Sequence, residues 1–517
     1  MPLLVAGIVI ACAMALPLAY LLLIVLGSGS AALETVFSSR TAGLLVRSVG
    51  LAAAVTASAI AIAVPLAWLT ARTDLPGARV WAVLAALPLV VPSYVGAYAF
   101  LSALGPTGLL QDILAGPFGV ERLPSIVGFP GAWLVLTLFT YPLIFLPVRA
   151  AILGLDPQLE EAARASGRGA RSAFTSVVMP QLLPAIAAGA VLVALYALHD
   201  FGAVSIMRFD TFTRDIFLEY RSSLDRIGAA SLSLVLVALM LILLWTEGRV
   251  RGSRALHRVG PGAARHPRRE SLGRWRPLAI GFCAAVTSLG VVLPAAVLVY
   301  WATRSFAGQP EWGEIATAAG HSLLVSGLAA VVAAGCAIPV AILAVRHRSS
   351  GTKALDWLAH IGYALPGVVV ALALVYFGTR VATPLYQTVA MLVFAFVVLF
   401  LPLATSAAKA RLGQMSPRLE EAARITGRGP LAVLRSITAP LMAGGLLAGG
   451  ALVFLTAVKE LPATLILAPT GFQTLATETW TATSVGFFER GAIPALLLLL
   501  ISAPSLYLLF GRERSAG

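Results

Sequence analysis

The sequence predicts an all-α membrane protein with about twelve transmembrane helices in two parallel six-helix repeats. Three observations lead to this fold class. The 517 residues are 59% hydrophobic and only 12% charged, with a mean hydropathy of +0.90, whereas soluble domains carry about 25% charged residues. The apolar runs are continuous and about 20 residues long, as membrane helices require, and lack the short alternation of a β-barrel. One polar motif occurs twice, which indicates an internal repeat.

The apolar runs place twelve spans along the chain. The first six are 3–27, 46–71, 80–104, 129–150, 181–207 and 228–247, and the second six are 277–303, 321–345, 355–377, 385–406, 441–468 and 488–511. The first run has no basic residue before it, so we expect a span that is kept rather than a cleaved signal peptide. The expected domains are a first repeat (1–247, motif loop 156–180), a basic cytoplasmic linker (248–276) and a second repeat (277–517, motif loop 416–440).

The basic residues predict the orientation of these spans. Nine arginines lie between Glu247 and Pro277, and basic loops stay on the cytoplasmic side. With this linker inside, both motif loops and both termini are also cytoplasmic. Six spans separate the two motifs, so both motifs face the same side, and a pseudo-two-fold axis along the membrane normal should relate the repeats. We expect the net charge of +14 to orient the spans and to contact lipid headgroups rather than to bind nucleic acid.

The repeated motif has two copies 260 residues apart. One copy runs from Glu160 to Pro180 and the other from Glu420 to Pro440. Ten positions are identical, namely Glu-Glu-Ala-Ala-Arg, Gly-Arg-Gly, one serine and the final proline. Because charge is costly in a membrane protein, a charged block kept twice indicates a task performed twice.

Each motif loop predicts a short, exposed cytoplasmic helix. Asp156-Pro157 and Ser416-Pro417 resemble helix starts, since Asp or Ser caps the N-terminus and Pro follows it. Gly167 and Gly427 match the helix ends. The glutamates then lie at the positive end of the helix dipole, and Glu and Arg four residues apart support the helix.

The apolar side of this helix, with Leu159, Ala162 and Ala163, would fit a groove on a partner protein. The alternative is an ordinary amphipathic helix resting on the membrane surface. Two copies on one side, at equivalent places, favour docking to two equal partners.

The motif resembles the signature of permease subunits of ABC importers, and its double occurrence resembles their fused-permease branch. In that family the helix is a coupling helix that seats in a cleft of a cytoplasmic ATPase. The resemblance assigns this coupling role to Glu160, Glu161, Ala162, Arg164, Gly167, Glu420, Glu421, Ala422, Arg424 and Gly427. It also implies two copies of an ATP-binding subunit that hold ATP and Mg²⁺, an extracytoplasmic substrate-binding protein, and a location in the bacterial cytoplasmic (inner) membrane. No cofactor is expected in this chain.

Two charged blocks inside predicted spans are candidates for the substrate pathway. His199 and Asp200 lie in the fifth span, and Lys459 and Glu460 lie at the same 260-residue offset in the eleventh. Each such charge costs about 2.5–3.5 kcal/mol at a helix centre. Pro462 should break its helix and free carbonyl groups to line a cavity. Two interpretations stay open: intramembrane ion pairs that orient helices, or a polar ring whose blocks face each other across the pore.

The substrate is less well defined than the class of protein. The carboxylates of Asp200 and Glu460 suit a hard cation as transient ligands, although no firm metal site is predicted, while Lys459 and His199 would equally suit an anion. The segments 200–205, 210–213, 459–464 and 471–477 resemble ferric-iron importer permeases, which implies iron(III). Thiamine and aminophosphonate importers are the alternatives within the family.

The sequence has no sign of an enzyme active site. It lacks the Gly-x-x-x-x-Gly-Lys-Ser/Thr phosphate loop, so we expect no ATP hydrolysis by this chain itself. An ion-coupled secondary transporter is the alternative from another class, because such proteins also often have twelve spans in two halves. It does not explain two docking helices on one side.

Overall fold

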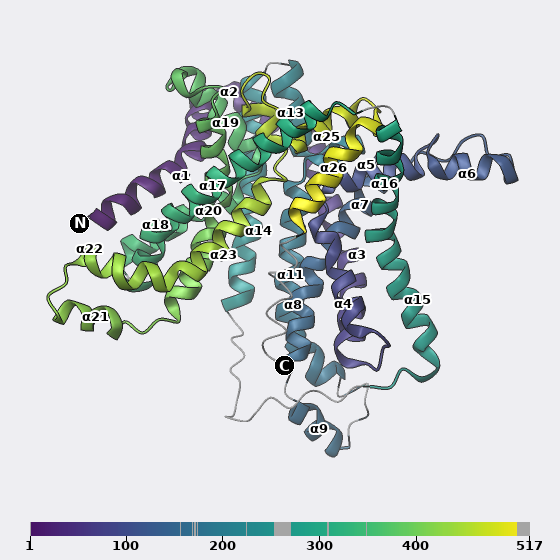
Figure 1. The fold of residues 1–517 in the computed structure, drawn as a ribbon, viewed down its shortest axis with the longest axis horizontal. Helices are drawn as coiled ribbons and strands as arrows, with labels where there is room; N and C mark the ends of the chain where they lie inside the picture. Colours follow the sequence, from purple (N-terminus) through teal and green to yellow (C-terminus); the bar gives the residue numbers. More distant parts are fainter. Residues whose placement is uncertain are drawn as a thin grey trace. The chain divides into compact units, whose positions relative to one another are not determined.

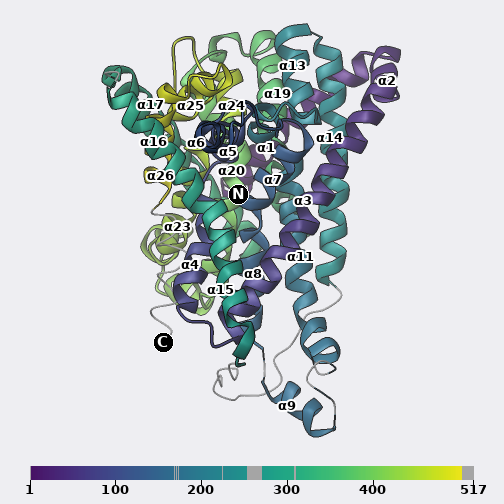
Figure 2. The same cartoon turned by 90° about the vertical axis from the view of Figure 1, so that its right-hand side faces the viewer.

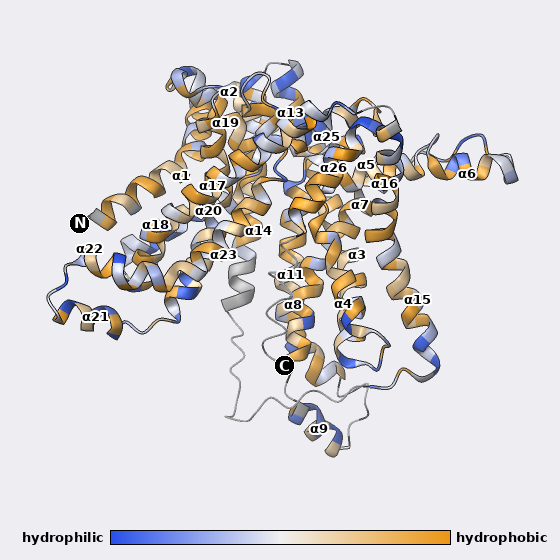
Figure 3. Cartoon of the chain, in the orientation of Figure 1, coloured by the Kyte–Doolittle hydropathy of each residue, from blue (hydrophilic) through white to orange (hydrophobic). Residues whose placement is uncertain are grey.

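The computed structural model describes residues 2–155, 157–167, 169, 172, 174–223, 225–252, 270–307, 310–347 and 349–503. Within these residues the protein is helical, with one isolated β-bridge between Thr73 and Glu270. Nine of the described helices are long and apolar enough to cross a membrane, and a bent pair would make ten. Hydrophobic residues dominate the long helices, and hydrophilic residues gather near helix ends (Figure 3). The all-α membrane class is confirmed, while twelve spans stay a prediction.

The chain forms two compact units, and each unit combines segments from both halves of the sequence. Of the described residues, unit 1 contains those within Met1–Ser38, Asp215–Val237 and Gly308–Tyr507, and unit 2 contains those within Ser39–Arg214 and Ala238–Ala307. The first helix of the chain therefore belongs with the second half. The first helices after the linker belong with the first half. The repeats 1–247 and 277–517 accordingly remain a description of the sequence.

Unit 2 is built around three helices that pack on one another: α3 (Ser39–Arg72), α8 (Pro142–Leu153) and α11 (Met179–His199). A short helix, α6 (Leu109–Phe118), projects from the rest of this unit (Figure 1). Its other helices are α4 (Ala78–Ala86), η1 (Leu87–Val90), α5 (Ser93–Leu104), α7 (Phe129–Thr140), α9 (Pro157–Ala165), η2 (Phe174–Val178), α12 (Gly202–Ile206), η4 (Gly273–Trp275), α15 (Arg276–Thr287), η5 (Ser288–Val292) and α16 (Leu293–Ala307). The two remaining helices, α13 (Phe212–Leu218) and α14 (Arg226–Gly252), pass from one unit into the other.

Unit 1 has the equivalent core of α17 (Trp312–Arg346), α20 (Val389–Gly413) and α23 (Ala439–Ala457). The N-terminal helix α1 (Pro2–Gly27) packs on α17, α18 (Ser350–Ala359) and α19 (Gly367–Arg380). The other elements of this unit are α2 (Ser30–Val36), η3 (Glu219–Ser223), η6 (Ile361–Ala364), η7 (Thr383–Leu385), α21 (Arg418–Ile425), α22 (Pro430–Val433), η8 (Leu434–Thr438), α24 (Pro462–Leu467), α25 (Leu475–Ser484) and α26 (Phe488–Ser502).

Several predicted spans are interrupted rather than continuous. The third bends by 98° between Ala78–Val90 and Ser93–Phe118, and the ninth is divided into α18 and α19. The fifth and eleventh break after α11 and after α23. Prolines begin or precede the second piece in three of these breaks, because proline has a fixed φ and no N–H to continue a helix.

The two repeats differ in length by one insertion. The equivalent prolines Pro92 and Pro366 lie 274 residues apart in the sequence. The equivalent prolines Pro142 and Pro402 lie only 260 residues apart. The fourteen extra residues of the first repeat fall between α5 and α7, where the projecting helix α6 lies. Equivalent residues are therefore found at one offset before this point and at another after it.

Candidate functional site

The first motif helix, α9, is tied to unit 2 through Glu160. The carboxylate of Glu160 forms one ion pair with Arg72, the last residue of α3, and another with Arg164 at 2.7 Å. The Arg72 side chain is only 4% exposed and that of Glu160 12%. Glu160 therefore points back towards its own unit. The helix itself lies beyond the ends of α8 and α11 (Figures 1 and 2).

The end of the linker also joins this group. The Glu270 N–H donates to the Arg72 carbonyl at 2.7 Å, and the Glu270 carbonyl accepts from the Asp74 N–H at 3.0 Å. The Glu270 carboxylate lies 3.5 Å from Arg164 of α9. The loop after α3, the linker end and the motif helix are thus connected at one end of unit 2.

The second motif helix, α21, is held in the same way. The Glu420 carboxylate pairs with Arg346, the last residue of α17, at 3.3 Å. It also accepts a hydrogen bond from the Thr438 hydroxyl at 3.1 Å, and Arg346 donates to the Met415 carbonyl at 3.2 Å. In both repeats, therefore, the first glutamate of the motif pairs with the arginine at the C-terminal end of the second predicted span. This span is α3 in the first repeat and α17 in the second.

The outward faces of α9 and α21 carry the remaining predicted coupling residues. Large apolar side chains stand out on them, since Leu159 is 52%, Leu419 50% and Ile425 86% exposed. The exposed motif positions are Glu161, Ala162, Arg164, Gly167, Glu421, Ala422, Arg424 and Gly427. The third predicted apolar contact, Ala163, is half-buried, because it lies three residues after Glu160 and therefore on the same side of the helix as that inward-pointing glutamate.

Glycine ends both helices, but the predicted serine cap is wrong. Gly167 and Gly427 have φ values of 85° and 80°, which is the left-handed conformation that glycine adopts at helix C-termini. The helix α21 begins at Arg418 after Pro417, with no side-chain cap, so Ser416 lies too early in the chain to cap it. The predicted cap of the first helix, Asp156, lies outside the described residues.

The first charged pathway candidate, Asp200, is a buried helix cap. Its carboxylate accepts hydrogen bonds from the backbone N–H groups of Ala203 at 2.9 Å and Val204 at 3.3 Å, at the start of α12. The Ser93 hydroxyl, at the start of α5, donates to the same carboxylate. Thr213 Oγ1 donates to the Asp200 carbonyl at 2.6 Å. Asp200 thus stabilises the break after α11 and joins the starts of two helices.

Glu460 occupies the equivalent break in unit 1. Its carboxylate accepts from the Ala463 N–H at 3.3 Å, and its carbonyl accepts from Thr464 Oγ1 at 2.7 Å. Gly367, the first residue of α19, takes the position that Ser93 has at the start of α5. A Cβ at Gly367 would lie 2.2 Å from Glu460 Oε1. The longer acid therefore occupies the space that Ser93 fills in the first repeat.

The other pathway candidates surround these breaks. His199 is the last residue of α11, and its Nδ1 lies 3.2 Å from the Leu195 carbonyl. Pro462 is the first residue of α24, so the helix breaks where the sequence predicts. Lys459 is half-buried. No ion pair involves Asp200, Lys459 or Glu460 within the described residues, so the ion-pair interpretation is not supported there. Whether the two blocks face each other stays a prediction, since they belong to different units.

Sequence reasoning missed the residues that hold these acids and helices. Ser48 Oγ accepts from the Phe212 N–H at 3.2 Å in unit 2, and Ser322 Oγ accepts from the Leu475 N–H at 2.8 Å in unit 1. The pair Ser48 and Ser322, like the pair Ser93 and Gly367, is separated by 274 residues rather than 260. A second offset, read from the prolines at 92 and 366, would have aligned both pairs.

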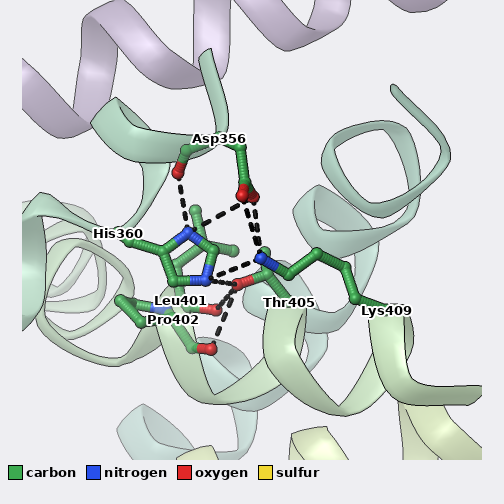
Figure 4. A network of polar contacts seen from close by, with 6 residues as sticks. All are labelled: Asp356, His360, Leu401, Pro402, Thr405 and Lys409. Carbon is green, nitrogen blue, oxygen red and sulfur yellow. Dashed lines mark hydrogen bonds and ion pairs between the residues drawn. The ribbon is translucent and has the colours of Figure 1, made fainter. Parts of the chain in front are cut away.

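One polar network has no counterpart in the first repeat (Figure 4). Lys409 Nζ on α20 donates to both carboxylate oxygens of Asp356 on α18, at 2.9 and 3.0 Å. His360 Nδ1 lies 2.7 Å from the Asp356 carbonyl, so Nδ1 carries the proton and Nε2 accepts from Lys409 at 3.3 Å. Thr405 completes the group, at 3.3 Å from Nε2. The equivalent residues of the first repeat are Ala82, Ala86, Phe145 and Arg149.

The described residues contain no group of three or more His, Cys, Asp or Glu side chains placed to hold a metal ion. Within the described part of the chain, each unit thus has one anchored, outward-facing motif helix and one helix break capped by a carboxylate.

Comparison with known proteins agrees with this double arrangement. The model of the family described as "binding-protein-dependent transport system inner membrane component" matches the chain twice, over residues 63–250 and 337–511. Over 506 residues the chain is 34% identical to the Fe(3+)-transport system permease protein FbpB 2 of Haemophilus influenzae, covering 97% of this chain and 96% of that protein. It is 24% identical over 408 residues to the ferric transport system permease protein FbpB of Actinobacillus pleuropneumoniae, covering 74% and 58%.

A shorter relative matches only part of the chain. The molybdenum transport system permease protein ModB of Escherichia coli is 33% identical over 195 residues, which is 36% of this chain and 84% of that protein. A relative about half as long would correspond to one repeat. With two family matches and one relative aligned from end to end, the chain belongs to the family of inner membrane components of binding-protein-dependent transport systems.

Proposed function

We propose that the chain is the permease subunit of an ABC importer for iron(III). The observation that carries this proposal is the 34% identity over 97% of the chain to a protein named for Fe(3+) transport. The molybdenum permease resembles a single repeat only, so it supports the class of transporter more than the substrate. Iron(III) is the cargo in this proposal, and the chain needs no resident metal of its own.

The complete architecture in this proposal has twelve spans with both termini in the cytoplasm. The equivalent cores α3–α8–α11 and α17–α20–α23 support two parallel repeats about a pseudo-two-fold axis. The basic linker supports the orientation, because arginine-rich loops stay in the cytoplasm. Both motif helices then project from the cytoplasmic face.

Each motif helix would couple the permease to one of two ATP-binding subunits, which carry ATP and Mg²⁺. The exposed apolar side chains, Leu159 on one helix and Leu419 and Ile425 on the other, suit a groove on such a partner. Glu161 and Glu421 flank them and would select a basic rim. The buried ion pairs of Glu160 and Glu420 would transmit movement of the docked helix to α3 and α17.

The substrate would arrive from an extracytoplasmic binding protein and pass inward by alternating access. We place the helix breaks at His199, Asp200, Lys459, Glu460 and Pro462 on that path. Their capped ends can shift as short segments without exposing unpaired backbone groups to lipid. In this proposal Asp200 and Glu460 maintain the breaks and also contact the cation transiently. Lys459 and His199 contribute polar groups to the path.

The test is to purify the chain co-expressed with its genomic neighbours and to measure ATP hydrolysis in lipid. We expect iron-loaded binding protein to stimulate hydrolysis more than iron-free binding protein does. If an ATPase co-purifies but iron has no effect, the importer class stands, and molybdate, thiamine and an aminophosphonate are the next substrates to test. If no ATPase associates, the proposed coupling role of the two motif helices fails.

A further inference from the structure

Unit 1 contains an open cavity that none of the assignments above uses. Its volume is about 300 Å³, and it is lined by Tyr220, Arg221, Arg226, Val375, Tyr376, Thr379 and Tyr386. The lining comes from η3, the start of α14, α19 and the segment after η7. Helix α19, which contributes three of the lining residues, is labelled in Figures 1 and 2. In the predicted topology, the loops 208–227 and 378–384 lie on the extracytoplasmic side of the membrane.

The charged side chains that line this cavity are all positive. It contains two arginines and no acidic residue. Arg226 lies over the ring of Tyr376, with its Cζ 5.9 Å from the ring centroid, and Arg221 lies similarly over Phe217 at 5.8 Å. Stacking on an aromatic face leaves the in-plane N–H groups of a guanidinium free to bind oxygen atoms. Neither arginine has an ion pair with a described residue.

The nearest acid in sequence, Asp225, is engaged elsewhere. Its carboxylate accepts hydrogen bonds from the N–H groups of Ile227 at 3.1 Å and Gly228 at 3.0 Å, which cap the start of α14. The Asp225 carboxylate lies close enough to act electrostatically on Tyr376 of the cavity, but among the described residues it forms no ion pair with either arginine.

The tyrosines add neutral hydrogen-bond donors. The Tyr376 hydroxyl donates to the Arg226 carbonyl at 3.4 Å, which fixes the ring beneath the guanidinium. Burial, together with the hydrogen-bonded Tyr386 hydroxyl, raises the pKa of Tyr220. Tyr220 therefore stays protonated at neutral pH, as a phenol that donates and not as a phenolate that would bind a cation.

From this geometry we propose that the cavity is a binding site for a small anion with several oxygen atoms, of the carboxylate or phosphate class. Two guanidinium forks match such oxygens in pairs. Tyr376 already donates its hydroxyl proton to the Arg226 carbonyl, so the hydrogen-bonded pair of Tyr220 and Tyr386 supplies the remaining hydroxyl donor. A bare ferric ion would find no carboxylate here. The link to transport rests on the proposed function: iron(III) would then reach the permease together with an anion, as a chelate or ion pair.

The described part of the first repeat has no equivalent of this site at the positions that can be compared. The residues equivalent to Val375, Tyr376 and Thr379 at the 274-residue offset are Leu101, Ser102 and Gly105. Ser102 accepts instead from Trp301 Nε1 at 2.5 Å. A single site per chain fits one substrate complex delivered to one permease, so the expected stoichiometry is one anion per chain.

Direct binding tests the site without requiring transport. The full-length chain, in nanodiscs of phosphatidylcholine, is equilibrated with radiolabelled citrate or inorganic phosphate. We expect saturable binding of one anion per chain, and a loss of affinity of about tenfold or more in Arg221→Gln/Arg226→Gln. Arg380→Gln, an exposed arginine on α19 outside the cavity, is the matched control and should bind normally. The variant Arg221→Lys/Arg226→Lys keeps the charge and tests for losses caused by misfolding.

The outcomes separate this inference from the proposed function. Equal binding by the Gln double variant and the wild type, or no saturable binding by the wild type in any lipid, overturns the anion site. If anionic phosphatidylglycerol in the nanodiscs displaces citrate and phosphate, the same oxyanion site is filled by a lipid headgroup. If anion binding is as expected but iron does not stimulate the assembled transporter, the iron assignment fails and the site stands.

Discussion

At the scale of single residues, Asp200 and Glu460 perform one structural task with side chains of different length. Each caps the short helix that follows a break and each lies against the start of a second helix. The shorter acid is met by the Ser93 hydroxyl, and the longer acid by the space at Gly367. The two pairs are complementary in size, so exchanging one member alone should cost more than exchanging both.

We predict that Asp200→Glu lowers the thermal stability of the purified chain, because the longer carboxylate meets Ser93 in a packed site. Overpacking of this kind typically costs about 1–3 kcal/mol. Adding Ser93→Gly recreates the pair found in the second repeat and should recover most of the loss. Melting followed by size-exclusion chromatography in detergent measures both variants. A double variant no more stable than Asp200→Glu alone would contradict the size argument.

The complementary change is Gly367→Ala in the second repeat. A methyl group there would lie 2.2 Å from Glu460 Oε1, so we expect a loss of stability, with recovery when Glu460→Asp withdraws the carboxylate. Gly281→Ala is a suitable control, since its Cβ would meet nothing within 4 Å.

At the scale of elements, the motif helix has two functions on two faces. Glu160 and Glu420 face inward to arginines, whereas Glu161 and Glu421 face outward with the exposed leucines. The inward pair holds the helix, and the outward pair is free to contact a partner. Variants of adjacent glutamates should therefore have different consequences.

We predict that Glu161→Lys with Glu421→Lys abolishes uptake and ATPase association while leaving the melting temperature of the chain unchanged. In contrast, Glu160→Gln should lower its stability by about 1–3 kcal/mol, since Arg72 is left buried without its partner. Co-purification and melting measure the two effects. Glu34→Lys, an exposed acid on α2, controls for the reversal of surface charge. Normal uptake by the Lys double variant would exclude docking through these faces.

The network of Asp356, His360 and Lys409 braces α18 against α20 in the second repeat alone (Figure 4). We predict that Lys409→Met destabilises the chain, because it leaves the Asp356 carboxylate without its cation. The effect should shrink when Asp356→Ala is added, with a coupling of roughly 1 kcal/mol or more. A double-mutant cycle of melting temperatures measures the coupling, and additive effects would show that the brace has no energetic role.

At the scale of the whole molecule, the two compact units do not correspond to the two halves of the sequence. Unit 1 needs α1 and the segment Asp215–Val237 from the first half, and unit 2 needs the segment 277–307, which follows the linker. Neither half contains a complete unit. The linker therefore joins two segments that must both be present before either unit can pack.

This organisation predicts the behaviour of a chain cut once in the linker. Each half expressed alone should be aggregated or protease-sensitive, while the two halves expressed together should give a monodisperse, protease-resistant complex. Limited proteolysis and size-exclusion chromatography provide the measurement. A single half that is stable alone would mean that each sequence repeat folds by itself.

The sequence by itself determined the membrane class, the internal repeat, the two motif helices and the family, because hydropathy and a repeated charged motif are local properties of the chain. It also located the helix break at Pro462. Only the tertiary structure decided which groups meet: Glu160 with an arginine 88 residues away, Asp200 with Ser93, and the N-terminal helix with the second half. These contacts depend on how helices distant in sequence pack, and the fourteen-residue insertion hides them from an alignment at a single offset. Packing chose the partner of each charge, and no local pattern records that choice.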